Sequence, residues 1–205
     1  METHIKGNPG HNNTYQESKI ENVETINYNP TIYQQCATTR LSNYFIRLTE
    51  EVSSNTRAPI KEELMEYTTH FDADMDLEQK LYQCGHKPSR IQDAKQVMEM
   101  FIKKLKNYAC YPSAQNIILL LMARIKNEFN TNIYPLIEHG TPLRTIMAQI
   151  RSRIVLPIMD TLNADGAFDE HLCFTEDHIY GMLYYLTGMG YISWIKEPEI
   201  LKICS

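Results

Sequence analysis

Residues 141–194 read TPLRTIMAQIRSRIVLPIMDTLNADGAFDEHLCFTEDHIYGMLYYLTGMGYISW, and this stretch decides the fold class. Thr141 and Pro142 fit a helix start, because threonine caps a first turn and proline suits its first position. Apolar residues then recur every three or four positions as far as Leu162, which predicts an amphipathic helix. Pro157 lies inside this run, so we expect a kink or a restart there.

The second half of the stretch predicts another helix, which begins after Thr175 and extends to about Gly188. Gly181 lies inside this helix, where glycine costs about 1 kcal/mol relative to alanine. A glycine among large apolar residues indicates that another helix approaches closely at this point. The residues that follow, 189–194, predict a short strand that ends at Trp194.

Before residue 141 the spacing of the apolar residues also predicts mainly helices. The segment around Ile117 to Met122 is apolar nearly all round, so we expect its helix to be central in a bundle. The expected helices are 41–52, 59–67, a piece ending at Gln83, 88–106, 113–129 and a short piece over 133–137. The predicted fold is therefore mainly α: a single helical-bundle domain over residues 31–205, with a short C-terminal strand.

Residues 1–30 form a polar N-terminal extension that is rich in asparagine and threonine. This composition favours a flexible tail. Ile20 to Tyr28 nevertheless approach the alternation of a strand, and such a strand could pair with a neighbouring copy. A tail and an assembly strand that gives a homo-oligomer both remain open.

Composition limits the classes of partner. The chain has 205 residues and a formal net charge of -5, which gives no general attraction to nucleic acid or to an anionic membrane. Its five cysteines are scattered and unpaired in sequence, which suits a reducing cytoplasm. We find no signal-peptide pattern and no apolar run long enough to span a bilayer, so we expect a cytoplasmic protein without a membrane contact.

The sequence predicts neither a metal site nor a cofactor. Asp72, Asp74 and Asp76 have the spacing of the first ligands of a calcium loop. Leu77 and Gln83 replace the glycine and the glutamate that close such a loop, so we expect a helix cap instead. We also find no glycine-rich phosphate loop and no paired-cysteine site.

The densest group of titratable residues surrounds Cys173, between His171 and His178. A cysteine and a histidine can form a nucleophile–base pair. Helix capping and solvent exposure explain these residues more simply, and we expect no enzymatic activity.

Two sets of residues are candidates for partner binding. Arg144 and Arg151 are seven residues apart on one helix face, where they suit carboxylates or phosphates; a solvated face is the alternative. The aromatic side chains are candidates because tyrosine and tryptophan are enriched at interface hot spots, and core packing is the alternative. This aromatic set is Tyr180, Tyr184, Tyr185 and Trp194.

Residues 141–195 resemble the C-terminal domains of bacterial ABC-three-component systems, the class that includes Lamassu-type defence. The resemblance is carried by the apolar helix with Pro157, by DHIYGMLYYLTG over 177–188 and by Ile192-Ser193-Trp194. A departure is Gly190-Tyr191, where a polar pair of the cysteine–histidine type is expected.

The resemblance implies a non-enzymatic adaptor that bridges an SMC-like ATPase, which senses foreign DNA, and an effector subunit. DNA would then be reached only indirectly. Two alternatives are a self-assembling protein and a DNA-binding winged helix made from residues 175–186 and 191–195. Glu176 and Asp177 disfavour the winged helix, because phosphates would repel that helix.

Overall fold

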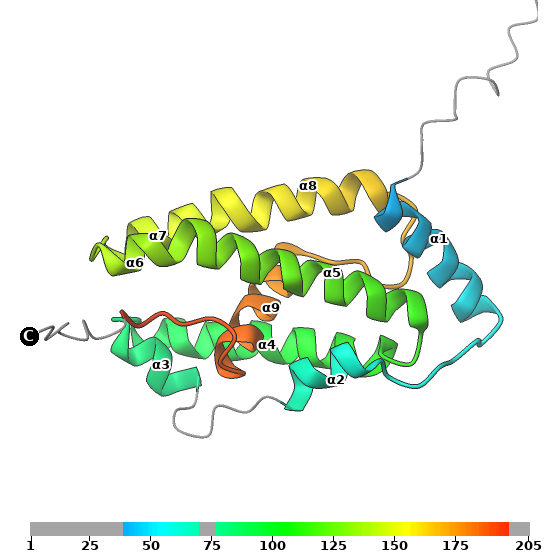
Figure 1. Ribbon diagram of the computed structural model, residues 1–205, viewed down its shortest axis with the longest axis horizontal. Coiled ribbons are helices and arrows are strands. Elements are labelled where there is room, and N and C mark those ends of the chain that lie inside the picture. The colour runs from blue at the N-terminus through cyan, green and yellow to red at the C-terminus, as the bar shows by residue number, and fades with distance from the viewer. Residues whose placement is uncertain (1–38, 70–76, 197–205) are drawn as a thin grey trace, which may run out of the picture. The chain divides into compact units, whose positions relative to one another are not determined.

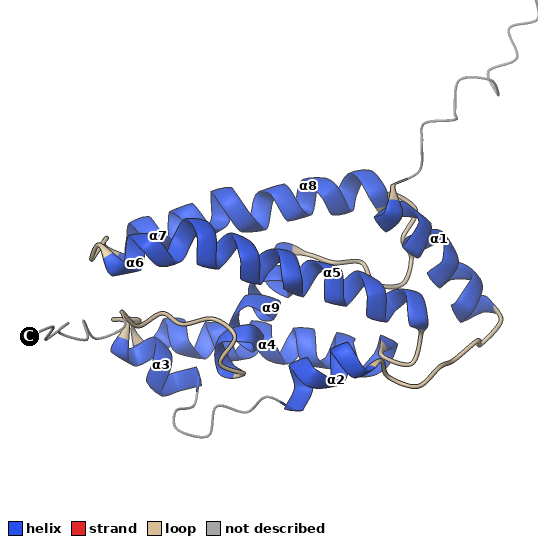
Figure 2. Cartoon of the chain, in the orientation of Figure 1, coloured by secondary structure: helices blue, strands red, loops and turns tan. Residues whose placement is uncertain are grey.

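A computed structural model describes residues 39–69 and 77–196, all within one compact unit, Ala37–Ser205. The mainly α prediction is confirmed, since Figure 2 shows only helices and loops in this described part. In chain order the elements are α1 Arg40–Ser53, α2 Glu62–Thr69, α3 Leu77–Gln83, α4 Pro88–Tyr108, α5 Pro112–Glu128, η2 Phe129–Ile133, α6 Tyr134–Glu138, α7 Leu143–Ile150, η3 Arg151–Val155, α8 Leu156–Asp165 and α9 Glu176–Gly188.

The helix α9 is the centre of the bundle. In Figure 1 it lies between α4 and the long helical hairpin that α5–α6 and α7–α8 form. It packs against α4 along its length and also contacts α3, α5 and α8. Every residue from Gly181 to Thr187 is buried. α9 therefore supplies much of the core, together with the fully buried face of α5 that the sequence predicts.

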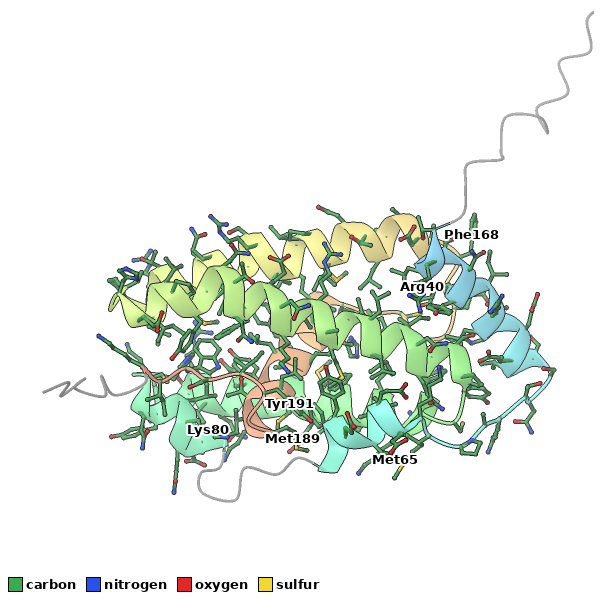
Figure 3. All side chains as sticks on the ribbon, in the orientation of Figure 1. Arg40, Met65, Lys80, Phe168, Met189 and Tyr191 are labelled. Carbon is green, nitrogen blue, oxygen red and sulfur yellow. The ribbon has the colours of Figure 1, made fainter. Side chains whose placement is uncertain are left out.

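Polar side chains complete both ends of α9. At its start, the backbone N–H of Thr175 donates to Nδ1 of His178 at 3.2 Å. At its end, Nζ of Lys80, labelled in Figure 3, donates to the carbonyl oxygens of Thr187 at 3.2 Å and Gly188 at 3.5 Å. These groups satisfy backbone atoms that a helix end leaves without partners, and a cation there also suits the helix dipole.

Each half of the long hairpin passes through one wide turn of π-helix. The N–H of Tyr134 bonds to the carbonyl of Phe129, and the N–H of Leu156 bonds to that of Arg151. Each wide turn ends just before a proline, Pro135 or Pro157. Proline lacks the N–H and clashes with the preceding turn, and widening that turn lets the helix continue past it. The restart expected at Pro157 is confirmed, because α8 begins at Leu156.

A carboxylate from α1 holds the first turn of α5. Glu51 accepts hydrogen bonds from the backbone N–H of Ser113 at 2.9 Å and from its hydroxyl at 2.6 Å. The buried Gln115 then fixes the loop before α2, because its Nε2 donates to the carbonyls of Pro59 and Ala109. Its Oε1 accepts from the N–H of Lys61. These bonds hold α1, α5 and the start of α2 in a fixed arrangement.

The predicted C-terminal strand is wrong. Gly190 has a φ of +80°, a left-handed conformation that turns the chain back. The N–H groups of Tyr191 and Ile192 then bond to the carbonyl of Leu186 at 2.9 and 3.3 Å. Residues 189–194 consequently fold against the end of α9, as the loop in Figure 2 shows. A winged helix needs both this strand and an exposed helix that can enter a DNA groove. Residues 191–195 form no strand, and α9 is buried along most of its length.

Two predictions concern residues outside the described ranges. These are the N-terminal assembly strand around Ile20 to Tyr28 and the helix cap expected from Asp72 or Asp74.

Candidate functional site

The aromatic set splits into core and surface. Tyr184, Tyr185 and Trp194 are 7%, 5% and 3% exposed, so these three side chains are part of the core. Tyr180 is half-buried at the edge of α9. For these three side chains the structure has the core packing that was the alternative interpretation, and Trp194 stacks on Tyr184. Partner binding by this set stays a prediction, and Tyr180 is the member that a partner could reach.

Trp194 is held on all sides by side chains of other elements. Its ring stacks on that of Tyr184 with centroids 6.4 Å apart, and it meets Phe129 at 5.2 Å and His86 at 5.3 Å. Its indole N–H donates to the hydroxyl of Thr187 at 2.9 Å. Burial raises the pKa of Tyr184 to about 12 and lowers that of His86, as expected for groups inside an apolar cluster.

The two arginines of the binding prediction lie on the surface. Arg144 is exposed on α7, and Arg151 is exposed at the start of η3. Nη2 of Arg151 pairs with a carboxylate oxygen of Glu176 at 3.0 Å, which joins η3 to α9. Next to this pair, burial raises the pKa of Tyr180 while Arg151 opposes that shift. We call Arg144, Arg151 and Tyr180 the arginine face.

The loop around Cys173 has a structural organisation. The carboxylate of Asp169 accepts from the backbone N–H groups of His171, Leu172 and Cys173 at 3.0, 2.9 and 2.7 Å. The Cys173 thiol donates to the carbonyl of Asp169 at 3.4 Å. His178 directs Nδ1 to Thr175 instead, so among the described residues no hydrogen bond joins it to Cys173. The helix cap expected here is present at Thr175 and His178, and Asp169 holds the loop that precedes it.

Lys104 supports the same loop from α4. Its Nζ donates to the carbonyl of Leu172 and lies 5.6 Å from the ring centroid of Phe174. Burial lowers the pKa of Lys104. Burial is also the main cause that lowers the pKa of His178, and the positive charge of Lys104 is the second cause. The cluster therefore favours a neutral histidine that accepts hydrogen bonds.

The structure also brings together residues that no sequence motif singles out. A groove between α1, α2 and α5 holds Arg40 and Lys61 beside two tyrosines, and its residues are far apart in sequence. Phe168 is 94% exposed in the α8–α9 loop. The one local signal was the spacing of Arg40 and Tyr44, which lie four residues apart and share a helix face.

The described ranges contain no group of three His, Cys, Asp or Glu side chains placed to hold a metal ion. Within the same ranges, no helix combines the length and the apolar character that crossing a bilayer requires.

The comparisons with known proteins gave one match. No curated protein and no solved structure matches the chain. The model of C-terminal domain 9 of the ABC-three component (ABC-3C) systems matches residues 76–194, which extends the resemblance upstream from residue 141 to α3. The matched region is more than half of the chain and contains the whole of α9 and the Trp194 cluster. The chain therefore belongs to the family of C-terminal domain 9 of ABC-3C systems.

Proposed function

We propose that this protein is a non-enzymatic adaptor that bridges an SMC-like ATPase and an effector subunit within its ABC-3C complex. The observation that carries the proposal is the family match, because a domain of a three-component system works with other components. Its helical body suits this role, since a bundle with a central buried helix gives rigid outer faces for docking.

The arginine face is the proposed docking surface for the ATPase. Arg144 has no ion-pair partner among the described residues, and Arg151 shares its charge with one exposed carboxylate. Guanidinium groups bind carboxylates through two parallel hydrogen bonds, which gives both affinity and orientation. Tyr180 adds an amphipathic ring at the edge of this face.

We expect Arg144→Glu combined with Arg151→Glu to reduce copurification of the ATPase by about tenfold or more, because each change places a like charge opposite the partner. The measurement is capture of the ATPase by the tagged chain when both are expressed with the effector. Arg153→Glu is the matched control, since this exposed arginine is not part of the arginine face and bonds to Gln149.

Unfolding of the variants must be excluded by thermal melting. The Arg151–Glu176 pair is exposed and screened by solvent, so its loss should change stability little and the double variant should melt close to the wild type. Equal capture by the wild type and the double variant would contradict the arginine face. Absence of capture by the wild type would contradict the adaptor role itself.

We expect the purified chain to lack nuclease and ATPase activity. The supporting observation is that the Cys173 loop uses its carboxylate, lysine and histidine to hold backbone atoms and a helix start. The assay is cleavage of duplex DNA and release of phosphate from ATP. Activity that disappears in both Cys173→Ala and His178→Ala would show that the loop is catalytic.

A further inference from the structure

A surface groove of about 480 Å³ lies between α1, α2 and α5. This volume falls in the range of about 300–1,000 Å³ that is usual for ligand-binding sites. Its floor is apolar and includes the half-buried Leu119 and Leu120 of α5. Its sides carry two cations and two tyrosines from α1 and from the region of α2.

The first side of the groove is Arg40 with Tyr44. Nε of Arg40 donates to the hydroxyl of Tyr44 at 2.9 Å, and the guanidinium carbon lies 5.6 Å from the ring centroid. This contact fixes the direction of the guanidinium but engages only one of its nitrogens. Among the described residues its two Nη groups make no hydrogen bond, so they are the groups that could bind an anion. Figure 3 shows Arg40 at the start of α1, where this residue is exposed.

The second cation is Lys61, just before α2. Its Nζ donates to the amide oxygen of Asn116 on α5, which points the ammonium toward the groove. Among the described residues, neither Arg40 nor Lys61 has a carboxylate within ion-pair distance. Within the described part of the chain, whose full sequence has a net charge of -5, the groove thus holds two positive charges that no carboxylate neutralises.

The opposite side is Tyr67, whose position is fixed by neighbours. Its ring lies 4.7 Å from that of Tyr191, and its carbonyl accepts from the hydroxyl of Tyr185 at 3.3 Å. Nζ of Lys126 lies 4.9 Å from the Tyr191 centroid, so Tyr191 is itself held in place beside Tyr67. Both sides are therefore rigid before a ligand arrives, which lowers the entropic cost of binding.

We propose that this groove binds an acidic segment of another ABC-3C subunit, with one apolar side chain on the Leu119–Leu120 floor and carboxylates at Arg40 and Lys61. Charge complementarity selects this occupant, because the unpaired cations need anions and the apolar floor needs an apolar group. Single-stranded nucleic acid fits less well, since it carries a charge at every nucleotide and cannot keep all of them away from Glu63 in the same groove, whereas a peptide can place its carboxylates at Arg40 and Lys61 alone. This partner assignment depends on the adaptor role proposed above.

The test uses overlapping fluorescent peptides that cover the ATPase and effector subunits of the same system, with binding followed by anisotropy. We expect the peptides that bind to contain at least two carboxylates beside an apolar residue, and we expect their affinity to fall as salt increases. Arg40→Glu with Lys61→Glu should weaken the best peptide by about tenfold or more. Lys103→Glu with Arg153→Glu is the matched control and should leave the affinity unchanged, because both residues lie outside the groove.

Several results would overturn the groove assignment. These are unchanged affinity in the Arg40/Lys61 variant, equal binding of a peptide whose glutamates are replaced by glutamine, and tighter binding of oligothymidine. Affinity that rises sharply when residues 1–30 are deleted would assign the groove to the chain's own N-terminal extension. If no peptide binds although the ATPase copurifies, the groove assignment fails and the adaptor role stands. If no peptide binds and the ATPase does not copurify, the groove assignment and the adaptor role both fail.

Discussion

Replacement of Gly181 by alanine is expected to lower the free energy of unfolding by about 3 kcal/mol. A Cβ atom at this position would lie 2.3 Å from the carbonyl oxygen of Val97 and 2.9 Å from Cβ of Phe101. Both atoms belong to α4 and the closer one is backbone, so a rotamer change cannot remove the clash. The two helices would have to separate, which would loosen the central α4–α9 contact.

Gly188 provides a matched control within the same helix. A Cβ atom there would meet Cβ of Leu77 at 3.9 Å and Sδ of Met98 at 4.0 Å, which is ordinary van der Waals contact. Gly188→Ala should therefore leave the melting temperature unchanged or raise it slightly, because alanine has the higher helix propensity. Thermal unfolding of both variants measures the difference. Equal melting of Gly181→Ala and the wild type would mean that α4 and α9 approach less closely than described.

Much of the helical pattern could be predicted because its signals are local. Pro88 and Pro112 each stand at the first position of the helix that they begin, where the missing N–H costs nothing. The apolar residues that recur every three or four positions correctly predicted which helix faces are buried. Gly181 also indicated its close neighbour correctly, because an interior glycine in a helix needs a compensating contact.

The strand prediction failed because a short apolar run can form either a strand or a loop that packs on a neighbouring element. The short apolar run of Tyr191, Ile192 and Trp194 fits an extended strand in a sheet. It fits equally a loop that returns to cover the end of a helix, and the backbone bonds from Tyr191 and Ile192 to Leu186 make the second arrangement. The choice depends on whether another strand is available, and none is present in the described part of the chain.

The candidate site could be predicted only in part, since tertiary contacts decide which side chains stay on the surface. Tyr180 and Tyr184 are four residues apart in one helix, yet the first is half-buried and the second is 7% exposed. The difference comes from Trp194, which stacks on Tyr184 from ten residues further along the chain. Arg40 and Lys61 likewise meet only because α1 and α2 pack on α5, and no sequence spacing indicates that.

Replacement of Trp194 by alanine is expected to lower the free energy of unfolding by about 3–5 kcal/mol, the usual cost of removing a large buried aromatic side chain. The ring is 3% exposed and contacts aromatic side chains from three parts of the fold, at Phe129, His86 and Tyr184. Loss of the ring would leave a cavity between the ends of α3, α5 and α9. Chemical denaturation of the variant and the wild type measures this loss.

Trp194→Phe separates a core role from a partner contact. Phenylalanine keeps an aromatic ring in the cavity but has no N–H, so the buried hydroxyl of Thr187 loses its 2.9 Å donor while it still donates to the carbonyl of Leu183. An acceptor left without a donor costs about 1–3 kcal/mol, to which the smaller ring adds. The variant should therefore melt between the wild type and Trp194→Ala, and it should still copurify with the ATPase. A variant that melts like the wild type but loses the ATPase would place Trp194 in the interface instead, since a purely internal side chain cannot affect a partner without affecting the fold.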